Sequence, residues 1–151
     1  METINSKLAE TATIYLRLAL AAAYLASVAS RFGLFGEGVS WGNFQNFLAY
    51  TAKVIPFLPA SFIPTVGWIA TLAEIILGVM LLVGFRIKEA AFLSGVMLIL
   101  FAIGMTLGFN AIEPLSYSVY SASAASFLLA VYHKSSFSLD AFIGKSIEMN
   151  S

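Results

Sequence analysis

Four long apolar segments constrain this chain more than any other feature. They cover approximately residues 11–32, 64–84, 89–108 and 116–132. Each has about 17–22 residues, enough for a helix to cross the roughly 30 Å hydrocarbon core of a bilayer. A segment in lipid must satisfy its own backbone hydrogen bonds, so all four should be helical. The sequence predicts an all-α fold, a four-transmembrane-helix bundle forming a single integral membrane domain over residues 1–151.

The composition supports a membrane location. Apolar residues make up 60% of the chain and charged residues only 11%, whereas a soluble domain carries about 25% charged residues. The formal net charge is zero, so there is no electrostatic reason to expect a nucleic-acid partner. Membrane lipids are the expected surroundings.

Basic residues predict the orientation of the bundle. Lys7 precedes the first segment, Arg86 and Lys88 fill the turn between the second and third, and Lys134 and Lys145 follow the fourth. Loops rich in lysine and arginine stay in the cytoplasm. Both termini are therefore expected on the cytoplasmic side of a multi-pass protein.

The first extracytoplasmic loop, residues 33–63, contains an amphipathic stretch, WGNFQNFLAYTAKVIPFLP. Its apolar residues recur at helical spacing, with Ser40 as the expected N-cap and Pro56 as the expected stop. Trp41 and Tyr50 are typical of the headgroup region. The loop is expected to contain either an interfacial helix that anchors to the membrane surface or a lid over a pocket between the helices.

Three charged residues fall within the apolar segments: Arg17, Arg31 and Glu74. Each costs roughly 2.5–3.5 kcal/mol to insert, so such residues usually face the bundle interior and pair. Side chains lean toward the N-terminus of their helix, so those of Arg31 and Glu74 should converge from opposite helices. We expect this pair in the outer half of the bundle, with Arg17 reaching the inner headgroups. The alternatives for Glu74 are a protonated structural contact or a titrating functional carboxylate.

Small residues predict close helix packing. The fourth segment has an unbroken run of serine and alanine over residues 121–126, and the third has Gly104-x-x-x-Gly108. Small residues let membrane helices approach closely. The two interpretations are tight packing within the bundle and a homodimer seam.

Polar and aromatic residues near the outer end define a hypothetical ligand site. Such a site would take a quinone, a lipid or a small amphiphile between the helices and beneath the loop helix. Glu113 is a further acidic neighbour at this end. The candidate ligand-binding residues are Arg31, Glu74, Trp41, Asn43, Tyr117 and Tyr120.

Several chemistries find no support in the sequence. The chain has no cysteine and a single histidine, His133. The chain therefore cannot form a disulfide or a Cys-ligated metal site, and one histidine is too few for a bis-histidine haem site. No phosphate-binding loop or dinucleotide fingerprint is present. No catalytic residue and no metal site are therefore predicted, no cofactor is firmly implied, and enzymatic activity is not favoured.

Several stretches resemble the DoxX-like family of small membrane proteins. The strongest is TLAEIILGVMLLVGFR at residues 71–86, followed by SRFGLFGEGVSWGNFQNFLAYTAKVIPFLP at residues 30–59. PLSYSVYSASAASFLLA and FSLD, nearer the C-terminus, are also similar to it. Ser30 stands where this family has an aspartate. The resemblance implies a bacterial inner-membrane protein with a four-helix bundle and a link to redox processes.

Three function hypotheses remain. The first is an accessory or sensor protein whose outer-leaflet pocket holds a quinone, lipid or amphiphile, with the redox link that the resemblance implies. The second is a structural subunit that packs in a larger membrane complex. The third, a quinone-linked oxidoreductase component, is the weakest because no residue set supplies electrons. The sequence does not distinguish the ligand, the partner or the oligomeric state.

Overall fold

The computed structural model describes residues 2–36, 38–132 and 137–148, with side chains from residue 6 to residue 144 of these ranges. Every regular element in this part of the chain is a helix, and none of it is strand. The elements are α1 (Glu2–Arg31), α2 (Phe44–Val54), the 3-10 helix η1 (Ala60–Phe62), α3 (Ile63–Val83), α4 (Ile87–Gly108), α5 (Ile112–Ser116), α6 (Val119–Val131) and α7 (Leu139–Glu148).

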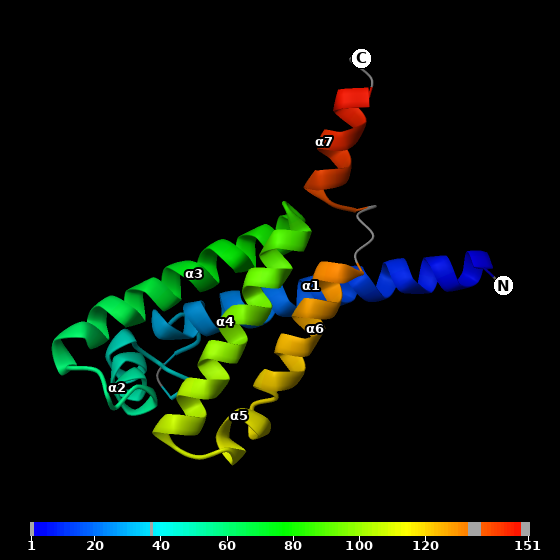
Figure 1. The fold of residues 1–151 in the computed structure, drawn as a ribbon. Coiled ribbons are helices and arrows are strands. Elements are labelled where there is room, and N and C mark those ends of the chain that lie inside the picture. The colour runs from blue at the N-terminus through cyan, green and yellow to red at the C-terminus, as the bar shows by residue number, and fades with distance from the viewer. Residues whose placement is uncertain (1, 37, 133–136, 149–151) are drawn as a thin grey trace.

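The long helices pack as two pairs. The most extensive contacts are those of α1 with α3 and of α4 with α6. Figure 1 shows α2 and α5 together at one end, which we call the outer end. Both termini and the α3–α4 turn lie toward the other, inner end, where α7 projects from the bundle. The predicted helical bundle, with a helix in the first loop, is thus present.

In the part of the chain that the structure describes, three helical segments are long and apolar enough to cross a membrane: Ser6–Arg31, Ala60–Val83 and Ile87–Gly108. The expected fourth span, residues 116–132, is wrong as a continuous helix. Its helical part, α6, has 13 residues, about 20 Å at 1.5 Å per residue and short of the roughly 30 Å core. The physical reason is Ser118, whose left-handed conformation (φ +55°) separates α6 from the short α5.

The ends of α3 agree with the predicted apolar segment, residues 64–84. Pro64 occupies the first turn, where its missing N–H costs no intrahelical bond. Gly84 ends the helix in the left-handed conformation (φ +71°), and its N–H donates to the carbonyl of Met80 at 2.9 Å. Both predicted boundaries are confirmed.

The expected N-cap of α2 is wrong. Ser40 lies in a turn with φ +54°, and Asn43 takes the capping position instead. The Oδ1 atom of Asn43 accepts a hydrogen bond from the N–H of Asn46 at 2.8 Å. Asparagine and serine cap helices about equally well, so residue type alone did not separate the two positions. Pro56 follows the helix end, as predicted.

The small residues of α6 pack against α4 inside the bundle. The Oγ atom of Ser123 donates to the carbonyl of Gly95 at 2.9 Å. A Cβ added to Gly95 would come within 2.9 Å of the Phe127 ring. The interpretation of tight internal packing is therefore confirmed for this face.

Gly104 and Gly108 have a different role: they hold α2 against α4. A Cβ on Gly104 would lie 2.7 Å from Val54, and one on Gly108 would overlap the backbone of Lys53 and Val54. These glycines thus let the backbone of α2 approach a membrane-spanning helix closely.

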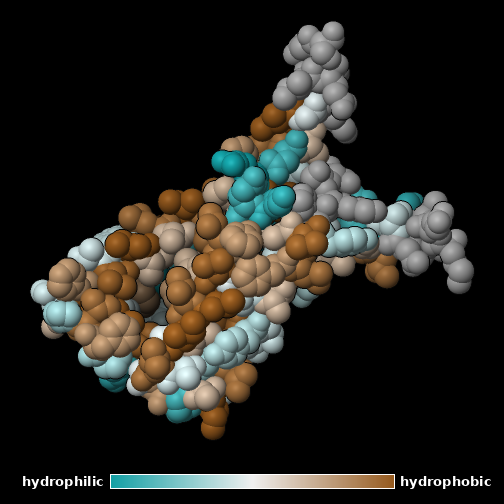
Figure 2. Space-filling model, in the orientation of Figure 1, coloured by the Kyte–Doolittle hydropathy of each residue, from teal (hydrophilic) through white to brown (hydrophobic). Residues whose placement is uncertain are grey.

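The surface agrees with a membrane protein. Figure 2 shows hydrophobic atoms over much of the visible face of the bundle, with a hydrophilic group where the α3–α4 turn meets the foot of α7. Side chains such as Ile69, Leu100 and Leu107 are about 62% exposed on the long helices. A face of this kind is stable only against lipid or another apolar surface.

Candidate functional site

Arg31 and Glu74 form a buried ion pair near the outer end of the bundle. Arg31 lies in the last turn of α1, and Glu74 lies in the middle of α3. The Nη2 atom of Arg31 is 2.7 Å from both carboxylate oxygens of Glu74 and donates to Oε1. Only 3% of Arg31 and 2% of Glu74 are exposed. The predicted pairing of these two residues is confirmed.

Two hydroxyl groups and one ring complete the surroundings of Arg31. Its Nη1 donates to Thr71 Oγ1 at 2.8 Å, and its Nη2 donates to Ser27 Oγ at 3.2 Å. The guanidinium carbon lies 3.7 Å from the ring centroid of Phe47, a favourable cation–π distance. The charge is therefore held by α1, α3 and α2 together.

The helix α2 covers this ion pair as part of an aromatic cluster. Phe47 is buried beneath it, and Phe44 packs on Trp68 of α3 with ring centroids 4.6 Å apart. Tyr50 packs on Phe109 after α4 at 5.1 Å. The cluster consists of Phe32, Trp41, Phe44, Phe47, Tyr50, Trp68 and Phe109. In this structure α2 is a packed cover whose side chains fill the space above Arg31.

The remaining candidate residues do not converge on the ion pair. Asn43 is exposed and caps α2, while Trp41 packs edge-on against Tyr50 with centroids 4.8 Å apart. Tyr117 is 68% exposed and Tyr120 is 42% exposed. The expectation of one shared polar pocket is wrong, because the ion pair is enclosed while these tyrosines are at the surface. A ligand-binding role for the individual residues stays a prediction.

Tyr50 lies in the helix that covers the ion pair, and its pKa is raised. Burial is the main cause, followed by the negative charges of Glu113 and Tyr117, and together they raise the pKa of Tyr50 to about 12. The phenol is therefore neutral at physiological pH. Glu113 and Tyr117, predicted to share a pocket with the ion pair, instead act electrostatically on Tyr50.

Two partners of Arg31 were missed at the sequence level although their spacing could have revealed them. Ser27 precedes Arg31 by four residues, and Thr71 precedes Glu74 by three, so each shares a helix face with one member of the pair.

A second chain of polar contacts, from Tyr24 through Ser94 to Ser126, was also missed. Its oxygen–oxygen distances are 2.6 Å and 3.1 Å.

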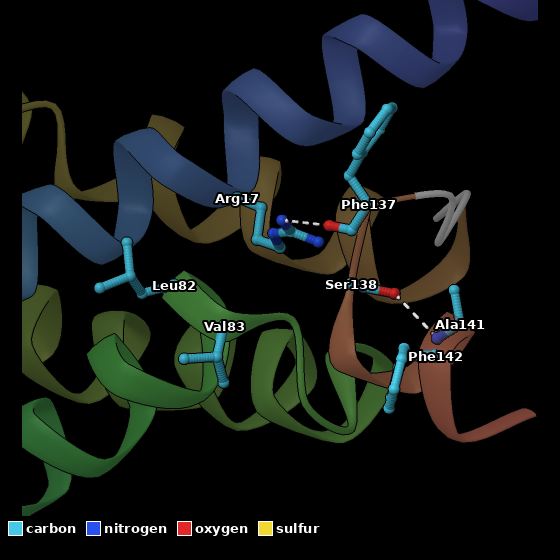
Figure 3. A pocket seen from close by; sticks show the side chains of 7 residues that line it. All are labelled: Arg17, Leu82, Val83, Phe137, Ser138, Ala141 and Phe142. Atoms are coloured by element: carbon cyan, nitrogen blue, oxygen red, sulfur yellow. Dashed lines mark hydrogen bonds between the residues drawn. The ribbon is translucent and has the colours of Figure 1, made fainter. Parts of the chain in front are cut away.

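Arg17 lies at the inner end, but the expectation that its side chain reaches the inner headgroups is wrong, because the side chain is buried within the protein. It is 5% exposed, and its Nη2 donates to the carbonyl of Phe137 at 2.7 Å (Figure 3). Phe137 and Ser138, just before α7, lie beside this side chain. A backbone carbonyl thus takes the place that a headgroup was expected to fill.

Asp140, at the start of α7, forms hydrogen bonds with the α3–α4 turn. The sequence analysis did not predict these contacts. Its Oδ1 accepts from the N–H of Arg86 at 2.8 Å, and its Oδ2 accepts from the N–H of Ile87 at 3.1 Å. Its own N–H donates to the carbonyl of Gly84 at 3.1 Å. One carboxylate therefore caps α4 from a residue more than fifty positions later in the chain.

Some of the basic residues that predict the cytoplasmic side lie in the part of the chain that the structure describes. Arg86 and Lys88 lie at the α3–α4 turn, at the end that also carries the termini (Figure 1). Lys134 and His133 fall outside the described residues, as does the side chain of Lys145. In the part that is described, no three His, Cys, Asp or Glu residues group as metal ligands would.

The family of the chain follows from its sequence. The model of the family described as "Methylamine utilisation protein MauE" matches residues 9–116, so the chain belongs to this family. No curated protein and no solved structure matches it significantly. The predicted DoxX-like membership is wrong, since the family match is to MauE. The motifs behind it are short runs of apolar and small residues, which recur wherever membrane helices pack closely.

Proposed function

We propose that this MauE-family chain is an accessory membrane protein of methylamine utilisation that holds other components of that system at the membrane. The family description supports the system. We place both termini in the cytoplasm of a bacterial cell, with α2 and α5 outside. The basic α3–α4 turn supports this orientation.

The closed Arg31–Glu74 pair is the observation that carries the scaffold role. Its members are almost fully buried, and Arg31 already bonds Glu74, Thr71 and Ser27. Neither the cavity beside Arg17 nor the one between α4 and α6 is lined by this pair. The most costly polar contacts of the bundle are thus used to hold α1, α3 and α2 together, as a rigid support requires.

The outer end also has a surface on which a partner protein would fit. Tyr117 and Tyr120 are exposed beside Ile112 and Leu115, which are 69% and 61% exposed. Exposed tyrosines with apolar neighbours are typical of protein interfaces. We place the contact with other methylamine-utilisation proteins on this α5–α6 surface.

Deletion of the gene in its native host tests the assignment to methylamine utilisation. Growth on methylamine as the sole nitrogen source should be lost, while growth on ammonium continues. The wild-type gene should restore growth on methylamine. Normal growth of the deletion strain on methylamine would overturn the proposal.

Crosslinking tests the scaffold role. A photoreactive residue at Tyr117 should capture a protein of the methylamine system in intact membranes. Tyr15, 74% exposed on α1, is the matched control and should not capture it. Equal capture at both positions, or capture at neither, would argue against the α5–α6 surface.

A further inference from the structure

The inner end contains a cavity of about 420 Å³ beside Arg17 (Figure 3). Pockets of roughly 300–1,000 Å³ hold small ligands. Leu82 and Val83 reach it from α3, and Ala141 and Phe142 from α7. Arg17, Phe137 and Ser138 complete the lining. It is therefore formed where residues 137–142 lie beside the middle of α1 and the C-terminal end of α3.

The cavity combines one buried cation with apolar walls. Leu82, Val83 and Phe142 are 46%, 45% and 71% exposed, so the walls continue onto the outer surface of the protein. Arg17 is the cationic member of the lining. This combination suits an amphiphile with a negative head and a hydrocarbon tail better than a purely polar ion.

Arg17 has donor capacity that the described protein does not use. Nη2 donates to the neutral carbonyl of Phe137, whereas the buried Nε has no acceptor in the described part of the chain. No carboxylate there lies within ion-pair distance of Arg17. The nearby Asp140 directs both its oxygens to the N–H groups of Arg86 and Ile87. Asp140 thus acts on Arg17 only through space, and a guanidinium without a directly bonded carboxylate favours binding of a phosphate.

We propose that this cavity binds an anionic phospholipid, with the lipid phosphate on Arg17 and the start of an acyl chain along Leu82, Val83 and Phe142. Basic pockets among membrane helices on the cytoplasmic side are suited to anionic headgroups. The lipid phosphate would give Arg17 the directly bonded anion that the described protein does not provide. This site is independent of the scaffold role at the outer end.

Lipid retention by the full-length protein tests the proposal. The protein is reconstituted in nanodiscs of phosphatidylcholine with phosphatidylglycerol, and bound lipid is counted by native mass spectrometry. The wild type should retain a single phosphatidylglycerol. Arg17→Gln should retain it about tenfold less, as expected for the loss of a charge-assisted hydrogen bond. Arg86→Gln removes an exposed arginine at the same end, outside the cavity lining, and should behave as the wild type.

A second variant keeps the test decisive if Arg17→Gln does not fold. Ala141→Phe leaves Arg17 in place but fills the cavity, and it should lose the lipid with an unchanged circular dichroism spectrum. Retention of phosphatidylglycerol by folded Arg17→Gln or by Ala141→Phe would overturn the proposal. Binding of inorganic phosphate alone, without phosphatidylglycerol, would also overturn the assignment to a lipid.

Discussion

Two buried arginines on the same helix, Arg31 and Arg17, differ in the groups that stabilise their charge. They are fourteen residues apart on α1, about 21 Å along the helix axis, and both are at least 95% buried. Arg31 has a carboxylate from α3, two hydroxyls and an aromatic ring. In the described part of the chain, Arg17 donates only to one backbone carbonyl. Arg31 is thus in direct contact with a carboxylate, whereas Arg17 interacts with the nearby Asp140 only through space.

Because of this difference, we expect the outer end to tolerate substitutions less well than the inner end. A buried charge that loses its partner is strongly destabilised, so the contacts at Arg31 should tolerate little change. The inner end depends on hydrogen bonds from the segment after α6, including the carboxylate of Asp140 at the α3–α4 turn. Substitutions there should cost less and act locally.

The largest effect is expected from Glu74→Ala, which leaves Arg31 buried without its counterion. The loss in unfolding free energy should be about 3–5 kcal/mol, measured by denaturant unfolding in detergent micelles. The double variant Arg31→Met with Glu74→Leu should recover much of this loss, because no unpaired charge remains. If Glu74→Ala and the double variant lost the same unfolding free energy, the ion pair would not be what stabilises the outer end.

The next effect concerns the cover over Arg31. Gly108→Ala places a Cβ against the backbone of Lys53 and Val54, so α2 must shift away from α4. We expect a loss of about 1–3 kcal/mol, as for overpacked cores. Gly144→Ala is the matched control, since a Cβ at that helical glycine meets no atom within 4 Å. Equal stabilities of the two variants would mean that α2 is not held by close backbone contact.

A smaller and more local effect is expected at the inner end. Asp140→Ala removes the cap on Arg86 and Ile87, at a cost of about 0.5–2 kcal/mol. Amide hydrogen exchange should become faster at these two residues. The amide of Asn46, capped by Asn43 at the outer end, serves as the internal control. Faster exchange at all three amides would indicate global loosening rather than a local cap.

The ion pair was predictable from the sequence because it depends on few variables. Helix direction, depth and side-chain lean suffice to bring Arg31 and Glu74 together. Ser27 and Thr71 follow from helical spacing to the same faces. A charged residue in an apolar segment thus helps to predict contacts, since it must find a partner near it in the bundle.

The inner end was less predictable because its contacts join distant parts of the chain. Asp140 caps residues 53 and 54 positions away, and nothing in the local sequence around it specifies that partner. The break before α6 depends on a left-handed serine, Ser118, a conformation that serine adopts rarely. Neither feature has a local sequence signature. The family itself was misassigned because packing motifs were interpreted as identity.

The smallest effect is a pH dependence of the cover through Tyr50. Its pKa is raised from 10.0 to about 12 in the folded chain, so above pH 10 the unfolded chain loses this proton first. Stability should therefore fall as the pH rises from about 10 and level off above about 12. Tyr50→Phe should flatten this slope, as measured by unfolding at each pH.

The same titration can test whether the two ends of the molecule respond separately. Glu113→Gln removes the second cause of the Tyr50 shift and should start deprotonation of the phenol at lower pH. Since Tyr50 and Phe47 share α2, loosening of this helix should speed amide exchange around Glu74 first. Exchange around Arg17, which α2 does not cover, should change later. Simultaneous opening of both ends would show that Arg31 and Arg17 belong to one cooperative unit, and the contrast between them would then be one of chemistry and not of local stability.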